Sequence, residues 1–273
     1  MNPTFLDIEG QKIAVYESAG KGKNVMLVHG NSANAGTFKH QFEGEFGDTY
    51  HVVAFDLPGH GASDKAREPE NTYHMPGYAK ILVEVAKQMN MNDAVFVGWS
   101  LGGHIVLEAI SELPDAAGFM IYGTPPIAFP PAMGEAFFPN PAMNAGFSAE
   151  VSREEAKAFT DAFFKAGGVA PESFIEDVLN TDGMARAIMG ASVGQANYKD
   201  EVEIVANMTQ PLAVFHGAEE QLVNADYISG LNMPTLWRSA VQKIADAGHV
   251  THWEQAEAFN ELLTAFIEDC YRD

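Results

Sequence analysis

A serine with the surroundings of a nucleophile stands in the Gly-Trp-Ser-Leu-Gly motif at residues 98–102. The apolar strand candidate Ala94–Val97 precedes the motif directly, and the helical run Gly103–Ile110 follows it. A serine in a tight turn between a strand and a helix has a strained backbone, and its hydroxyl projects above the edge of the sheet. The pattern therefore predicts that Ser100 is a nucleophile. The alternative is an ordinary serine in a glycine-rich turn.

A serine hydroxyl attacks only when a base takes its proton, and the base must be oriented by an acid. Among nine histidines, His249 follows a late strand candidate and precedes the last helix, as the order serine, acid, histidine requires. His252 is the weaker candidate for the base. His249 and His252 could also pair on a metal, but no third histidine or carboxylate stands at ligand spacing. We therefore predict neither a metal nor another cofactor.

The acid is expected in the loop after the strand candidate Leu212–His216, where Glu219 and Glu220 are adjacent. We favour Glu220, three residues after Gly217, over Glu219, and we place Asp226 third. Solvent-exposed glutamates are common in such loops, so the pattern is less specific here than at Ser100 or His249.

Acyl transfer also requires hydrogen-bond donors for the oxyanion that develops in the transition state. The amide of Leu101, at the start of the helix after the serine, can supply one donor. The second is expected from the turn His29-Gly30-Asn31-Ser32 after the strand candidate Val25–Val28, where the amide of Asn31 can face the nucleophile. We interpret His29, at the end of its strand, as a buried structural histidine.

Short apolar and β-branched runs alternate with amphipathic stretches, which is typical of a mostly parallel α/β sheet. Helical spacing of apolar residues predicts a crossover helix around residues 78–89 and a final helix around residues 259–267. The strand candidates are Lys12–Glu17, Val25–His29, Val52–Phe55, Ala94–Trp99, Gly118–Tyr122, Leu212–His216 and Val241–Ile244.

The alternation of strand candidates with amphipathic stretches stops between Ile127 and Thr209, where a proline-rich stretch is followed by helical patterns. Ser152 and Glu155 form a capping box, which predicts a helix that continues through Phe159 and Phe163. We therefore predict a core domain over residues 1–126 and 210–273, and a helical cap inserted over residues 127–209.

Composition limits the classes of function. The 273 residues suit one domain with an insertion, and a formal net charge of −21 disfavours binding to nucleic acid or to anionic membranes. The single cysteine, Cys270, cannot form an intramolecular disulfide. Neither a signal-peptide pattern nor an apolar run of membrane-spanning length occurs, so we expect a soluble, cytoplasmic protein.

Taken in order, these motifs resemble the α/β-hydrolase superfamily across nearly the whole chain. The motifs are His-Gly-Asn-Ser at residues 29–32, Asp-Leu-Pro-Gly-His-Gly-Ala-Ser at 56–63, Gly-Trp-Ser-Leu-Gly-Gly-His at 98–104 and Ala-Gly-His at 247–249. The resemblance implies a mostly parallel eight-stranded sheet flanked by helices, with the inserted cap. It also implies a metal-independent Ser100-His249-Glu220 triad and an oxyanion hole formed by Asn31 and Leu101.

Within the superfamily, the first and third motifs together with Gly-Thr-Pro-Pro at residues 123–126 resemble the AidH-like, serine-dependent N-acylhomoserine lactone lactonases, which are quorum-quenching enzymes. This resemblance implies a serine hydrolase that opens the lactone ring through an acyl-enzyme. A general carboxylesterase and a catalytically inactive, hydrolase-like ligand receptor are the alternatives.

The predicted cap is rich in Phe and Met, which suits a small-molecule lactone or ester with an apolar acyl chain. The candidate substrate-binding residues are Trp99, Phe138, Met143 and Phe159. The same aromatic residues could instead form the core of the cap. The sequence predicts no oligomeric state.

Overall fold

Eight strands form one sheet in the computed structural model, which describes residues 2–272. Their spatial order is β1-β2-β4-β3-β5-β6-β7-β8, with β2 antiparallel to both β1 and β4 and all other neighbours parallel. The mostly parallel eight-stranded sheet is therefore confirmed. The strands are β1 (Thr4–Ile8), β2 (Gln11–Glu17), β3 (Asn24–Val28), β4 (His51–Phe55), β5 (Val95–Trp99), β6 (Gly118–Tyr122), β7 (Leu212–Gly217) and β8 (Gln242–Ile244).

The strand β1 is absent from the strand candidates of the sequence. It lies at the edge of the sheet and joins β2 through a tight turn in which Glu9 and Gly10 both have positive φ. Because an edge strand pairs on one side only, its residues need not form an apolar run, and Phe5 is 53% exposed. Its hydrophobic pattern is therefore too weak to identify the strand.

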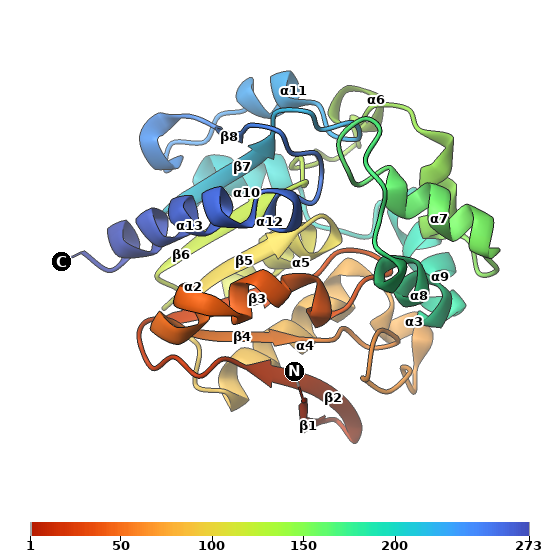
Figure 1. The fold of residues 1–273 in the computed structure, drawn as a ribbon, viewed down its shortest axis with the longest axis horizontal. Coiled ribbons are helices and arrows are strands. Elements are labelled where there is room, and N and C mark those ends of the chain that lie inside the picture. The colour runs from red at the N-terminus through yellow and green to blue at the C-terminus, as the bar shows by residue number, and fades with distance from the viewer. Residues whose placement is uncertain (1, 273) are drawn as a thin grey trace.

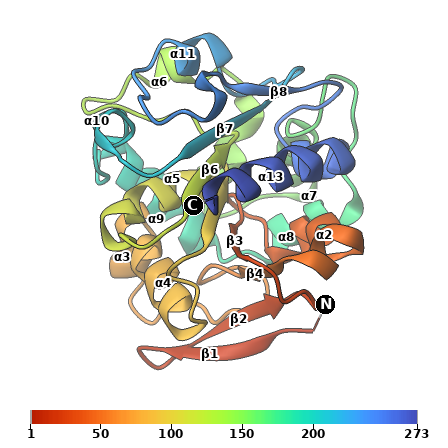
Figure 2. The same cartoon turned by 90° about the vertical axis from the view of Figure 1, so that its left-hand side faces the viewer.

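Helices cover both faces of the sheet (Figure 2). The predicted crossover helix is α4 (Met75–Gln88), which lies with α5 (Leu101–Ala109) and α10 (Glu201–Asn207) on one face, whereas α2 (Gly44–Thr49) and α13 (Ala256–Cys270) cover the other. The helices α4 and α13 each bury one apolar face, which includes Tyr78, Leu82 and Val85 on α4 and Phe259, Leu263 and Phe266 on α13. The remaining short elements of the core are η1 (Ala35–Phe38), α1 (Lys39–Phe42), α3 (Pro69–Thr72), η2 (Ile110–Glu112), α11 (Ala225–Ser229), η4 (Trp237–Ser239) and α12 (Thr251–Glu254).

The chain between β6 and β7 is helical or irregular. It contains α6 (Met133–Ala136), η3 (Pro141–Phe147), α7 (Arg153–Asp161), α8 (Glu172–Asn180) and α9 (Gly183–Gly194), followed by α10. Figure 1 shows α7, α8 and α9 grouped at one end of the sheet. In contrast, α10 lies against α5 of the core, although the predicted cap includes it. The boundary of the cap at residues 127 and 209 thus remains a proposal.

The predicted capping box is present at the start of α7. The Ser152 amide donates to Glu155 Oε2 at 2.8 Å, and the Glu155 amide donates to Ser152 Oγ at 3.2 Å. The helix ends at Asp161, so the predicted continuation to Phe163 is wrong. Phe163 instead lies in the turn that follows, where its carbonyl group accepts hydrogen bonds from outside the helix.

Within residues 2–272, no helix is both long enough and apolar enough to cross a membrane.

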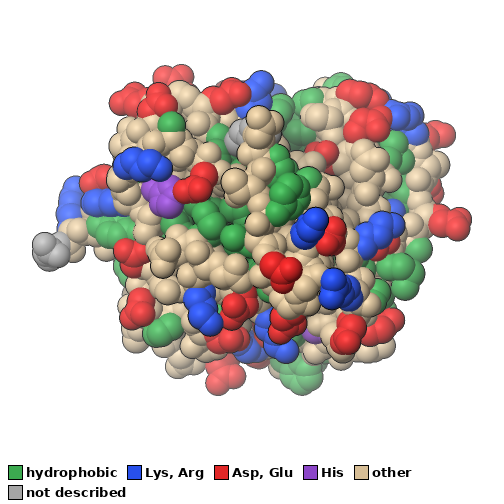
Figure 3. Space-filling model, turned by 90° about the horizontal axis from the view of Figure 1, so that it is seen from below, with side chains coloured by type: hydrophobic (Ala, Val, Ile, Leu, Met, Phe, Trp, Pro, Cys, Tyr) green, Lys and Arg blue, Asp and Glu red, His purple; other side chains and the backbone are tan. Residues whose placement is uncertain are grey.

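On the face seen in Figure 3, acidic and basic side chains are interspersed.

Candidate active site

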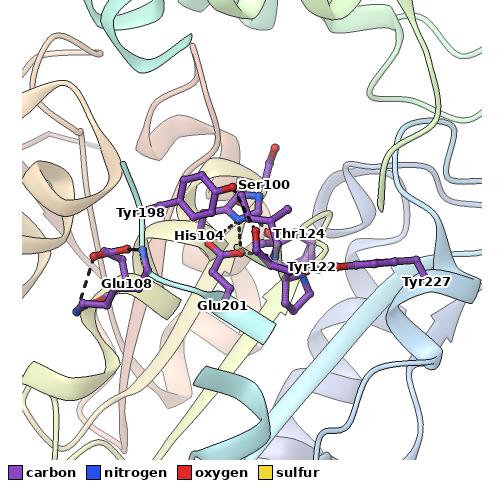
Figure 4. Close-up of polar contacts among 12 residues, drawn as sticks. Ser100, His104, Glu108, Tyr122, Thr124, Tyr198, Glu201 and Tyr227 are labelled. Atoms are coloured by element: carbon purple, nitrogen blue, oxygen red, sulfur yellow. Dashed lines mark hydrogen bonds and ion pairs between the residues drawn. The ribbon is translucent and has the colours of Figure 1, made fainter. Parts of the chain in front are cut away.

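The turn between β5 and α5 holds Ser100 in a strained conformation, with φ 54° and ψ −121°. Such a backbone costs of order 1–3 kcal/mol and persists only where its surroundings enforce it. Here the Ser100 amide donates to the Tyr122 carbonyl at 2.9 Å, and the Ser100 carbonyl accepts from Thr124 Oγ1 at 2.8 Å (Figure 4). Leu101 is the first residue of α5, so its amide is among those that no carbonyl of the helix can satisfy.

The glycines of the motif allow this turn to pack closely. A Cβ atom at Gly98 would lie 2.4 Å from the Gly102 carbonyl oxygen, and one at Gly102 would lie 2.1 Å from the Val28 carbonyl oxygen. Any side chain at either position would therefore push α5 away from β3 or distort the turn. The glycines of the sequence motif around Ser100 thus have a direct steric role.

His249 and Glu220 lie together at the ends of their loops, although 29 residues separate them in the chain. His249 Nδ1 is 2.8 Å from Glu220 Oε2, and both side chains are almost fully buried. Because a carboxylate only accepts hydrogen bonds, Nδ1 carries the proton and Nε2 is left free to accept one. Nε2 is buried and has no hydrogen-bond partner within residues 2–272.

The environment of Glu220 favours its charged form. Burial by itself raises the pKa of this carboxyl group. The electrostatic attraction and hydrogen bond of the His249 imidazole, together with the Leu222 amide, which donates to Oε1 at 2.8 Å, outweigh the effect of burial, so that the pKa is lowered. Glu219 is exposed to solvent. The structure therefore brings Glu220, and not Glu219, to His249.

The imidazole of His249 is fixed by its neighbours. Trp99 Nε1 donates to the His249 carbonyl at 3.0 Å, and Gly123, at φ 59°, lies so close that a Cβ atom there would be 2.6 Å from the imidazole Cε1. His252 is placed differently: its Nε2 is 2.9 Å from Thr37 Oγ1, and burial lowers its pKa to about 3. His252 is therefore buried and hydrogen-bonded to Thr37, whereas His249 is hydrogen-bonded to Glu220.

The loop that contains Asn31 lies beside Ser100, since a Cβ atom at Gly30 would be 3.1 Å from Ser100 Cβ. The Asn31 side chain reaches the inserted segment, where its Nδ2 donates to the Gly146 carbonyl at 2.6 Å. His29 is fully buried, accepts at Nε2 from the Leu57 amide at 3.0 Å, and has its pKa lowered to about 4 by that burial. These contacts fit the structural role predicted for His29.

The candidate substrate-binding residues are distributed unevenly. Trp99 and Phe159 are fully buried and each packs edge-on against Phe163, with ring centroids 5.6 and 4.7 Å apart respectively. Met143 is partly buried on η3. Phe138 is 45% exposed and lines a pocket of about 180 Å³ that it shares with Glu220. The other three candidates do not line this pocket.

A buried pair behind Ser100, formed by His104 and Glu201, was not predicted from the sequence. His104 Nδ1 lies 2.8 and 2.9 Å from the two carboxylate oxygens of Glu201, which also accepts from the Ile127 amide at 2.8 Å (Figure 4). His104 ends the serine motif, but nothing in the sequence indicates that its partner lies 97 residues away. The pair joins both ends of the inserted segment to α5.

No group of three His, Cys, Asp or Glu side chains within residues 2–272 is arranged to hold a metal ion.

Comparisons with known proteins agree with this architecture. The family model described as the alpha/beta hydrolase family matches residues 25–262. A hydrolase from a Pseudomonas species that acts on 2-hydroxy-6-oxononadienedioate and 2-hydroxy-6-oxononatrienedioate is 25% identical, over 96% of this chain and 95% of its own.

Solved structures of the N-acyl homoserine lactonase AidH superpose with a TM-score of 0.95. A mutant of that protein complexed with N-hexanoyl homoserine lactone is 36% identical, with 99% of each chain covered. A complex with N-butanoyl homoserine is 37% identical and covers 100% of this chain and 98% of its own. An esterase from Exiguobacterium antarcticum, with a TM-score of 0.79 and 20% identity, shares the fold. The resemblance predicted from the motifs is thereby confirmed.

Proposed function

The chain belongs to the alpha/beta hydrolase family, and from this premise we propose that it is a serine hydrolase that opens the lactone ring of N-acylhomoserine lactones. Ser100 is the nucleophile, His249 the base and Glu220 the acid that orients it. The amides of Leu101 and Asn31 form the oxyanion hole. The observation that carries the proposal is the likeness, over nearly the full length of both chains, to a lactonase solved with an acyl homoserine lactone.

In the proposed first step, His249 Nε2 takes the proton of Ser100 Oγ as the oxygen attacks the lactone carbonyl carbon. The imidazolium that forms is stabilised by the Glu220 carboxylate, 2.8 Å from Nδ1. Collapse of the tetrahedral intermediate breaks the ring C–O bond, and the ring oxygen takes the proton from Nε2. Water then attacks the acyl-enzyme with the same base, releasing the ring-opened acid and free Ser100.

The segment over the proposed oxyanion hole suits an apolar substrate. A Cβ atom at Gly146 would lie 3.0 Å from the Phe159 ring and 3.2 Å from Asn31 Nδ2, so η3 packs between these two residues. We propose that Phe159 and Met143 contribute to the wall of the acyl site, that Trp99 acts mainly by holding the His249 carbonyl, and that Phe138 lies outside the site.

The test is to incubate the protein with N-butanoyl and N-hexanoyl homoserine lactones and, separately, with p-nitrophenyl acetate, and to identify the products by mass. We expect one molecule of water to be added to each lactone while its amide stays intact. Release of free homoserine lactone and a fatty acid would mean amide cleavage. Turnover of the simple ester alone would favour a general carboxylesterase, and binding without turnover would favour a receptor.

Ser100→Ala is expected to reduce kcat by roughly 10⁴-fold to 10⁶-fold without unfolding the protein, because removing one member of such a triad disables the whole unit. Ser173→Ala, a change at an exposed serine of α8, is the matched control and should leave kcat unchanged. Full turnover by folded Ser100→Ala protein would refute the serine mechanism.

A further inference from the structure

Three consecutive residues of the inserted segment, Phe163–Lys165, form what we call the strap. The strap follows α7 and crosses the loop that carries His249. The Phe163 carbonyl accepts from the His249 amide at 2.8 Å and from the Val250 amide at 3.1 Å. The Phe163 ring packs on the imidazole of His249, with the ring centroids 5.6 Å apart. The backbone and the ring of His249 therefore both rest on the inserted segment.

The strap also contacts the loop of the acid. Gln221, which follows Glu220 directly, donates from its Nε2 to the Phe164 carbonyl at 2.7 Å. One short piece of the inserted segment is thus hydrogen-bonded to the loop of the proposed acid and to the loop of the proposed base. A displacement of the strap would alter the position of each relative to Ser100.

Glu254, the last residue of α12, fastens the strap to the loop of the base. Its Oε2 accepts from the Gly248 amide at 2.7 Å, and the Lys165 amide lies 3.2 and 3.3 Å from its two carboxylate oxygens. The approach is close enough to require glycine, because a Cβ atom at Gly248 would be 2.7 Å from the Lys165 nitrogen. The carboxylate therefore accepts hydrogen bonds from two backbone amides that belong to different parts of the fold.

We propose that Glu254 is a positioning residue, which holds the strap against the loop of His249 and so sets the geometry of the base toward Ser100. The expected effect of Glu254 on the reaction rate rests on the proposed function, whereas its effect on the position of the His249 loop does not. Charge-assisted hydrogen bonds to amides are among the stronger ones, so one carboxylate can hold both chain segments. The inserted segment then contributes to the chemistry through backbone groups as well as covering the site.

The test compares Glu254→Ala and Glu254→Gln with the unaltered full chain. We expect Glu254→Ala to reduce kcat for the lactone by about 10-fold to 100-fold, as misplacements of about 1 Å do. KM should change by a smaller factor, because Glu254 is hydrogen-bonded to backbone amides and not to Phe159 or Met143. In Glu254→Gln, the side-chain carbonyl oxygen can still accept from one amide, but an NH₂ group faces the second amide. The loss of kcat in this variant should therefore lie between that of Glu254→Ala and none. Glu257→Ala, at an exposed glutamate of α13, is the control and should match the unaltered chain.

A second readout does not depend on turnover. The proton on His249 Nδ1, which is hydrogen-bonded to Glu220, should give a downfield NMR resonance that is retained in Glu257→Ala and shifts or broadens in Glu254→Ala. Failure of the unaltered protein to hydrolyse lactones would refute the proposed function, while the resonance would still test the positioning role. An unmoved resonance with unchanged kcat would overturn the proposal, as would a rise in KM with kcat unchanged.

Discussion

Replacing Glu201 by alanine would remove the acceptor that joins both ends of the inserted segment to the helix behind Ser100 (Figure 4). Two buried donors, His104 Nδ1 and the Ile127 amide, would lose their partner. Each buried donor left unsatisfied costs about 1–3 kcal/mol, and breaking a buried pair typically costs about 3–5 kcal/mol. We therefore expect Glu201→Ala to lower the free energy of unfolding by about 3–5 kcal/mol.

Urea unfolding followed by circular dichroism measures this loss of free energy. If the slope of the free energy of unfolding against urea concentration is unchanged, the variant and the unaltered protein unfold by the same reaction. Glu201→Gln should lose less, since its carbonyl oxygen still satisfies one of the two donors. Glu203→Ala is the control, because Glu203 lies on the same helix but is exposed. A loss below about 1 kcal/mol for Glu201→Ala, or a loss no larger than that of the control, would refute the reasoning.

Contacts elsewhere in the site and the inserted segment lead to three more predictions. Glu220→Gln should reduce kcat far more than Glu219→Gln, because of these two residues only Glu220 contacts His249, the proposed base; the reverse order in steady-state assays would contradict the geometry. Gly123→Ala places a Cβ atom 2.6 Å from the imidazole at φ 59°, so it should cost at least about 1–2 kcal/mol in stability and lower kcat, whereas Gly134→Ala, with open space around it, should do neither. Burial raises the pKa of Asp177 from 3.8 to about 7, so the stability that comes from its neutral form is present below about pH 4 and is lost as the pH rises through 7. Asp177→Asn should therefore raise the unfolding free energy at pH 8 by at least about 1 kcal/mol and change it little at pH 4; equal effects at both pH values in urea titrations would argue against this titration.

Local sequence patterns determined most of the strands and helices of this protein and the turn at Ser100. A strand, a tight turn and a helix are specified by neighbouring residues, so the motif at residues 98–102 is sufficient by itself to predict the strained turn at Ser100. Periodicity likewise predicted α4, α13 and the strands buried on both faces. The edge strand β1 escaped because an edge strand needs little apolar surface, and its hydrophobic pattern is weak.

Tertiary structure decided the contacts between residues that are distant in the chain. Glu219 and Glu220 are chemically identical, and only the path of the loop after β7 brings Glu220 to His249. Folding likewise brings Glu201 to His104, and Glu254 to Gly248 and Lys165. Strap contacts through the Phe163 carbonyl have no sequence signature at all, because every residue carries the same backbone groups and only their arrangement in space determines which of them meet.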